Sequence, residues 1–156
     1  MNNSITNEEF KKLFNMNKYF VNKKNILPSI NEEKKYDIIS ENRKDKFILD
    51  TSRKGTYSLH KVKLQKRYAT TISLIRLEID APPHVNPDGK KISRDHIHIY
   101  KEGYGLAYAY DLESIKQINL NLEDLSDFNK IFIEFCKFCN INIDNRVELQ
   151  GVLTWI

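Results

Sequence analysis

The stretch TYSLHKVKLQKRYATTISLIRLEID, residues 56–80, says most about the fold class of this chain. Its second half alternates apolar and charged side chains, with Arg76 and Glu78 placed between apolar residues. Those apolar residues are Ile75, Leu77 and Ile79. Alternation with a period of two is typical of a β-strand that buries one face. Since residues 56–68 alternate in the same way, the stretch predicts two strands of an antiparallel sheet.

Shorter strand-like segments lie on both sides of this stretch. Four of them are rich in β-branched or aromatic residues: residues 35–40, 46–51, 95–101 and 106–111. The polar segment ENRKD (41–45) separates the first two at the length of a hairpin turn. Residues 81–91, APPHVNPDGKK, are dense in Pro, Gly and Asn, which predicts a loop. The segment VELQGV (147–152) is a candidate closing strand.

A helix is predicted on each side of the strand region. Thr6 and Glu9 match a capping box, and apolar residues at helical spacing follow them, so we expect a helix over residues 7–21. A second apolar stripe with helical spacing predicts a helix over residues 125–140. The expected caps of this second helix are Ser126 and Asn140.

The order of these elements predicts an α+β fold. It would consist of an N-terminal helix, an antiparallel sheet of five or six strands and a C-terminal helix packed on the sheet. A chain of 156 residues suits one domain, residues 1–156. Its expected parts are an N-terminal helix and connection (1–35), the sheet (36–111) and a helical C-terminal part (112–156).

Composition excludes several classes of protein. No apolar run approaches the length of about 18 residues that crosses a membrane, and the N-terminus lacks the apolar segment of a secretion signal. The two cysteines, Cys136 and Cys139, are too few for a disulfide scaffold. Because they lie among phenylalanines one helical turn apart, they are typical of buried core cysteines. We therefore expect a cytoplasmic protein that has no membrane partner.

Charge is distributed unevenly along the chain, whose formal net charge is +4. Residues 1–67 hold 16 of the 25 Lys and Arg residues but only 8 of the 21 acidic residues. Residues 102–156 hold 4 Lys and Arg residues and 9 acidic residues. The basic residues with nearby tyrosines that could follow a nucleic-acid backbone are Arg53, Lys54, Lys61, Lys63, Lys66 and Arg67, with Tyr57 and Tyr68. A solvated face of the sheet would explain the same residues equally well.

The candidate site lies in residues 80–105, which hold three of the four histidines. On a strand, His96 and His98 project from the same face, about 6.5–7 Å apart, while the isoleucine between them faces the core. The stiff loop before this strand, with its Pro82-Pro83 pair, could hold His84 and Asn86 over the strand, or it could be a plain connection between strands. A pair of histidines mounted on a rigid strand is what a functional site needs.

Three interpretations of this pair remain open. His96 and His98 could bind a divalent metal, the cofactor that such a pair would accept, with His84 or a loop aspartate completing the ligands. They could instead act as general acid and base in phosphodiester cleavage, with Arg94 or a nearby lysine holding the phosphate. They could also only form hydrogen bonds within the sheet. Glu102 follows the pair in partial resemblance to the first cupin motif, but no second cupin motif follows.

Two motifs carry a resemblance to a known family: PPHVNPDG (82–89) and RDHIHIYKEGYG (94–105). With them the sequence resembles small uncharacterised proteins of prophages and other mobile elements in low-GC bacteria. The likeness runs from about residue 36 to residue 139 and includes the RKG turn (53–55). It implies a context of mobile DNA and its conflicts with a host, and it implies no mechanism.

Three functions are consistent with these features. The first is a toxin-like ribonuclease that uses His96 and His98 as catalytic residues or metal ligands. The second is a non-enzymatic anti-defence protein, similar to an anti-CRISPR, that binds and blocks a host nuclease complex through its charged surface. The third is a metal- or ligand-binding module with a pocket lined by tyrosines, which would be Tyr104, Tyr108 and Tyr110. The expected partner is therefore nucleic acid or a host nuclease complex.

Overall fold

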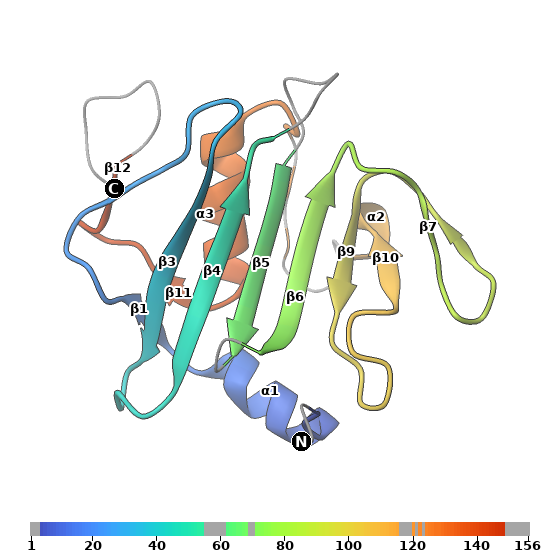
Figure 1. Ribbon diagram of the computed structural model, residues 1–156, viewed down its shortest axis with the longest axis horizontal. Helices are drawn as coiled ribbons and strands as arrows, with labels where there is room; N and C mark the ends of the chain where they lie inside the picture. Colours follow the sequence, from blue (N-terminus) through green and yellow to red (C-terminus); the bar gives the residue numbers. More distant parts are fainter. Residues whose placement is uncertain are drawn as a thin grey trace.

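The computed structural model of the chain describes residues 4–54, 62–68, 71–115, 120, 122 and 124–148; for residues 62–66 and 115 it describes the backbone alone. The described part is built around an eight-stranded sheet with the strand order β10-β9-β6-β5-β4-β3-β1-β11 (Figure 1). In that order the strands are β10 (Ala109–Asp111), β9 (His96–Ile99), β6 (Ile72–Ile79), β5 (Val62–Tyr68), β4 (Lys46–Ser52), β3 (Glu33–Ser40), β1 (Lys18–Phe20) and β11 (Ile141–Asn142). Neighbouring strands are antiparallel except β1 and β11, which run parallel.

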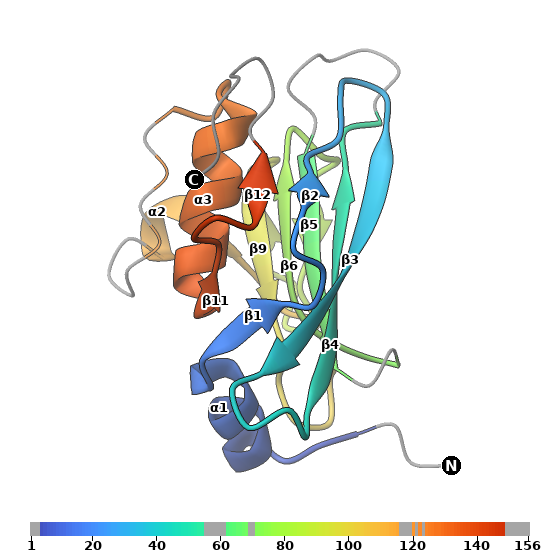
Figure 2. The same cartoon turned by 90° about the vertical axis from the view of Figure 1, so that its left-hand side faces the viewer.

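Helix α3 (Phe128–Phe138) packs on one face of this sheet and forms the core with it. Phe132 lies near the middle of α3. The centre of its ring is 6.5 Å from the ring centre of Phe20 on β1 and 6.4 Å from that of Tyr36 on β3. Figure 2 shows α3 and the short α2 (Leu112–Ile115) on the same side of the sheet. The alternating burial along β3 and β4 follows from this packing, because only every second side chain faces α3.

The α+β class is therefore correct, but the sheet differs from the expected one. It is mixed and has eight strands, because the short segments β1 and β11 extend it beyond β3. The segment 147–152 does not close it: β12 (Val147–Glu148) pairs with β2 (Asn25–Ile26) in a separate two-stranded sheet. The rest of that predicted strand, and residues 56–61 of the predicted strand over 56–68, lie outside the described residues.

The loop expected over residues 81–91 contains a small hairpin. Strand β7 (His84–Val85) pairs with β8 (Lys91–Ile92), and the expected Asn-Pro-Asp-Gly turn connects them, with Gly89 at a positive φ of 88°. The Asn86 side chain binds both the N–H and the C=O of Ala109 on β10. This side chain fastens the hairpin to the end strand of the main sheet, and Figure 1 shows β7 beside β10.

Helix α1 (Asn7–Asn15) begins as the sequence predicts and ends earlier. The capping box is present: Thr6 Oγ1 accepts from the Glu9 N–H and the Glu9 carboxylate accepts from the Thr6 N–H. The predicted continuation to residue 21 is wrong, because Lys18–Phe20 pairs with β3 and β11 instead. Pairing with distant strands outweighs the local helical pattern here.

Helix α3 is likewise shorter than the predicted range 125–140. Its N-cap is Asp127 rather than Ser126, and the Asp127 side chain accepts from the Lys130 N–H. Asn140 ends the helix as expected, with a positive φ of 56°. Cys136 and Cys139 are both buried and are not joined by a disulfide, which agrees with core cysteines.

Lys18, the first residue of β1, is fully buried. Its ammonium donates three hydrogen bonds, to the carbonyls of Phe14 (2.9 Å), Met16 (2.7 Å) and Cys139 (2.9 Å). These carbonyls belong to the C-terminal ends of α1 and α3, where helices carry partial negative charge. One buried lysine therefore joins the ends of two helices that are far apart in the sequence.

No helix in the described ranges is long and apolar enough to cross a membrane.

Candidate metal centre

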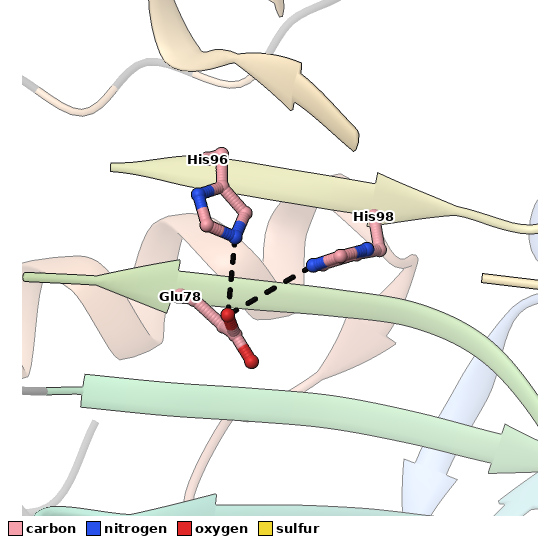
Figure 3. A group of neighbouring side chains, drawn as sticks. All are labelled: Glu78, His96 and His98. Carbon is pink, nitrogen blue, oxygen red and sulfur yellow. Dashed lines mark hydrogen bonds and ion pairs between the residues drawn. The ribbon is translucent and has the colours of Figure 1, made fainter. Parts of the chain in front are cut away.

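The candidate site lies where β6 and β9 are neighbours, on the sheet face opposite α3. The register pairs Glu78 with His96 and Arg76 with His98. Ile97, between the two histidines, is fully buried in the core. The period of two therefore places Glu78, His96 and His98 on one face, as Figure 3 shows.

The two imidazoles converge on one carboxylate oxygen. His96 Nε2 lies 3.0 Å and His98 Nε2 lies 3.8 Å from Oε2 of Glu78. One candidate ligand atom from each of the three residues lies within 4.8 Å of the other two. The histidine side chains are only 1% and 3% exposed, whereas Glu78 is 20% exposed, so solvent meets the cluster at the carboxylate.

Backbone carbonyls fix the tautomer of both rings. His96 Nδ1 lies 2.6 Å from the Ser93 carbonyl oxygen, and His98 Nδ1 lies 2.7 Å from that of Leu106. A carbonyl oxygen only accepts, so each Nδ1 carries the proton and donates it. In neutral histidines the Nε2 lone pairs would then both point at the carboxylate of Glu78.

Such an arrangement requires a positive charge in its centre. An Nε2 lone pair and a carboxylate oxygen are both acceptors, so a proton or a cation must lie between them. Burial lowers the pKa of His96, but its hydrogen bonds to Glu78 and Ser93 outweigh burial and raise the pKa above its ordinary value, which favours a proton between His96 and Glu78. The hydrogen bond from His96 and the nearby His98 and Arg76 hold the pKa of Glu78 far below its ordinary value.

His84 covers the cluster from the β7–β8 hairpin. Its ring centre lies 4.7 Å from that of His98 and 6.1 Å from that of His96. His84 Nε2 donates to the Ala107 carbonyl at 2.7 Å, so its Nδ1 carries the lone pair. The expectation that this segment holds His84 over the pair is therefore met.

Asp111 supports the loop that orients His96. Its Oδ1 accepts from the Ser93 hydroxyl (2.6 Å) and the Ser93 N–H (2.9 Å), and these two bonds lower the pKa of Asp111. The carbonyl of the same serine accepts from His96 Nδ1. Asp111 on β10 thus fixes one of the carbonyls that set the tautomers.

We expect Asp111→Asn to lower the free energy of unfolding at pH 7 by about 1 kcal/mol, because a charged acceptor of two hydrogen bonds is lost. The native pKa of Asp111 lies below the value of about 3.9 for a free aspartate. Its contribution is therefore complete above that pH and is lost as the pH falls through the native pKa. Urea denaturation of both proteins between pH 7 and pH 3 measures the difference, and a difference that does not shrink toward pH 3 would contradict this origin.

Two other candidate catalytic residues make contacts away from the imidazoles. Arg94, whose side chain is 62% exposed, pairs with Asp80 at 3.0 Å. The carboxylate of Glu102 accepts from the Asn7 N–H, and the Glu102 N–H donates to the Asn7 side chain. Glu102 therefore joins the β9–β10 hairpin to the start of α1. Within the described part of the chain, the carboxylate that gathers with the two imidazoles is that of Glu78.

The described members of the basic set are engaged with other groups. Arg67 forms a bidentate pair with Asp50 (2.6 and 2.9 Å), and Lys54 pairs with Glu33. Arg53 donates a hydrogen bond to the Pro28 carbonyl and its guanidinium lies over the Phe128 ring. The hydroxyl of Tyr68 donates to the carboxylate of Asp45. Lys61 lies outside the described residues, as do the side chains of Lys63 and Lys66. Nucleic-acid binding by this set stays a prediction.

Two of the three tyrosines expected to line a pocket contact each other, and the pocket itself stays a prediction. The rings of Tyr104 and Tyr108 meet edge to face, with centres 5.2 Å apart. Lys101 Nζ lies over both, at 4.4 Å from the centre of Tyr108 and 5.4 Å from that of Tyr104. Tyr110 lies on β10 and is partly exposed. A lysine of the chain itself thus takes the place beside the two rings.

Glu78 is the site residue that the sequence reasoning missed. Its position between Leu77 and Ile79 places it on the outward face of a strand, but nothing local says which strand lies beside it. Only the pairing of β6 with β9 brings its carboxylate to His96.

The three side chains fit a divalent transition metal. Two imidazoles and one carboxylate form a known ligand set for zinc and for iron(II), in which further positions are left for water or substrate. Two ligand atoms of tetrahedral zinc lie about 3.4 Å apart, as bond lengths near 2.1 Å imply, and the observed 3.0 and 3.8 Å bracket that spacing. Imidazoles that donate Nδ1–H to a backbone carbonyl and present Nε2 are typical of metal ligands.

Comparison with known proteins identifies a family for this chain. No curated protein and no solved structure matches the chain significantly. A family of unknown function, DUF6978, matches residues 5–141, a range that contains the whole histidine cluster and also the N-terminal helix. The expectation of an uncharacterised family is thereby confirmed. The chain belongs to DUF6978, a family of unknown function.

Proposed function

We propose that this protein binds a divalent transition-metal ion, with zinc as the reference case, through Glu78, His96 and His98. We further propose that the metal serves to hydrolyse phosphodiester bonds of nucleic acid. One observation carries the proposal: two Nε2 atoms with fixed lone pairs face a single carboxylate oxygen at 3.0 and 3.8 Å. A cation of charge two satisfies all three ligands, whereas a single proton satisfies only one of the two nitrogens at a time.

The burial pattern supports a metal with a reaction to perform. The histidines are enclosed, which holds them rigidly, while the carboxylate side of the cluster is open to solvent. Zinc bound to three protein ligands lowers the pKa of a bound water to about 7 and so supplies a hydroxide nucleophile near neutral pH. In phosphodiester hydrolysis this hydroxide attacks phosphorus, the P–O bond to the leaving group breaks, and the leaving oxygen takes up a proton from water.

Nucleic acid is the substrate that the rest of the chain favours. The first 67 residues carry an excess of basic side chains, and a mobile-element context would supply nucleic-acid targets in the cytoplasm. This proposal unites two of the sequence-based interpretations, since the histidines act as metal ligands in a nuclease and not as its acid and base. Their enclosed side chains support the ligand role.

Zinc titration tests the metal site directly. Isothermal titration calorimetry on the chelator-treated wild type is expected to show one zinc ion per chain. The double variant His96→Ala/His98→Ala is expected to bind zinc at least about 100-fold more weakly, because even loss of a ligand's supporting partner typically costs 10- to 100-fold. Glu113→Gln, at an exposed glutamate of α2, is the matched control and should bind zinc like the wild type.

Two results would overturn the proposal. One is a wild type that binds neither zinc nor manganese nor iron(II), which would leave the cluster as a protonated ion pair that stabilises the sheet. The other is zinc binding that the double variant retains unchanged, which would place the metal elsewhere in the chain.

A further inference from the structure

Arg76 is the charged residue next to the candidate metal centre. It lies on β6 two residues before Glu78, so both side chains project from the same face, and the register places it opposite His98. Arg76 Nε lies 3.2 Å from Oε1 of Glu78. The imidazoles approach the other carboxylate oxygen, Oε2, so Glu78 stands between the arginine and the histidines.

The guanidinium of Arg76 has unused hydrogen-bonding capacity. Its Nε is buried and forms an ion pair with Oε1 of Glu78 at 3.2 Å, but in the described part of the chain it forms no hydrogen bond. A buried donor without a hydrogen-bond partner is costly and is rare in native proteins. The contrast with Arg67 is direct: on the same face of the sheet, Arg67 forms a complete bidentate pair with Asp50.

The charge around the centre also calls for an anion. With neutral imidazoles, a divalent ion and Arg76 outweigh the one carboxylate of Glu78 and leave the site positive. The side chain of Arg76 is 27% exposed and that of Glu78 is 20% exposed, so an anion can approach from solvent on this side. A planar guanidinium matches the spacing of two oxygens of a phosphoryl group, which a single ammonium does not.

We infer that Arg76 and the metal together bind the phosphoryl oxyanion of the substrate, with one oxygen on the metal and another on the guanidinium. This inference rests on the proposed function, since the metal is one of the two binding partners. It assigns Arg76 as the residue that selects a phosphate ester over an uncharged ester, and it gives the buried Nε a partner when substrate binds.

Cobalt(II) substitution provides a test that does not depend on activity. Cobalt(II) in such a site absorbs visible light, and an anion that enters its coordination sphere changes the spectrum. Inorganic phosphate is titrated into the cobalt-loaded wild type, Arg76→Gln, Arg76→Lys and Arg43→Gln. We expect phosphate binding to weaken at least about tenfold in Arg76→Gln and less in Arg76→Lys, which keeps the charge but loses the planar fork. Arg43→Gln, at an exposed arginine between β3 and β4, is the control and should match the wild type.

A second titration identifies the source of the phosphate group. A short single-stranded RNA without a terminal phosphate should displace inorganic phosphate from the cobalt-loaded wild type if the ligand is a phosphodiester of nucleic acid. If RNA does not displace phosphate, the nucleic-acid part of the proposed function is overturned. The inference that Arg76 binds a phosphate group then still stands.

The outcomes separate this inference from the proposed function. Absence of cobalt binding by the wild type overturns the proposed metal site and the inference with it. Equal cobalt binding and equal phosphate affinity in the wild type and in Arg76→Gln overturn the inference alone. Cobalt binding in each arginine variant also shows that the variant is folded at the site, and Arg76→Lys serves should Arg76→Gln not fold.

Discussion

Replacing Lys18 with methionine is expected to lower the free energy of unfolding by about 3–5 kcal/mol, more than any other single substitution considered for this chain. Methionine has a similar length and is apolar, so the buried volume changes little. What is lost is the ammonium that donates to the carbonyls of Phe14, Met16 and Cys139.

The size of this effect follows from the position of those carbonyls. They lie at the C-terminal ends of α1 and α3, where no further turn supplies N–H donors. A buried carbonyl without a donor costs about 1–3 kcal/mol. Three carbonyls lose the ammonium together; the bond to Cys139 is buried, those to Phe14 and Met16 are part-buried, and the Phe14 carbonyl keeps a long contact with Asn140 Nδ2. Since proteins of this size are stable by about 5–15 kcal/mol in total, the variant should unfold at a much lower urea concentration.

Lys46→Met is the matched control, because Lys46 is an exposed lysine at the start of β4. Urea denaturation followed by circular dichroism should give a midpoint close to the wild type for Lys46→Met and a strongly lowered one for Lys18→Met. A loss below about 1 kcal/mol for Lys18→Met, within the range of ordinary surface substitutions, would show that water or a rearranged backbone replaces the ammonium.

Replacing Glu78 with glutamine is expected to abolish metal-dependent activity. The amide keeps the shape of the side chain but removes the negative charge that both imidazoles face. Zinc affinity should fall at least about 100-fold, because the lost group is a metal ligand and not a supporting partner. Zinc-dependent cleavage of single-stranded RNA should be lost at zinc concentrations that saturate the wild type.

Two readouts keep this prediction separate from a loss of folding. Glu113→Gln, at an exposed position on α2, should retain wild-type zinc binding and cleavage. Urea denaturation in the presence of a chelator shows whether Glu78→Gln is folded without metal. If the folded variant cleaves RNA as fast as the wild type, Glu78 is not a ligand of the catalytic metal.

Local sequence patterns were sufficient to predict most of the helices and strands near the site. Strand β6 was predicted because its side chains alternate, and the same period placed His96 and His98 on one face of β9. The start of α1 was predicted because a capping box involves only Thr6 and Glu9, which are neighbours along the chain. Each of these features is decided by residues within one or two turns or within one strand.

The errors arose where distant segments meet. Residues 18–20 continue a helical pattern, but they form β1 because β3 and β11 are available on either side of them. Lys18 would lie on the surface of the predicted helix, yet it is buried between two helix ends. Periodicity alone does not show whether a segment continues a local helix or pairs with a strand more than 100 residues away.

Short-range alternation and turn chemistry were enough to predict the α+β class, the strand that carries the histidine pair and the Asn-Pro-Asp-Gly turn after His84. The strand order, in contrast, became known only from the folded chain. That order places β6 beside β9, so that Glu78 and Arg76 meet His96 and His98. The physical reason is that backbone hydrogen bonds between strands are the same for every sequence, so which strands become neighbours depends on how the whole core packs.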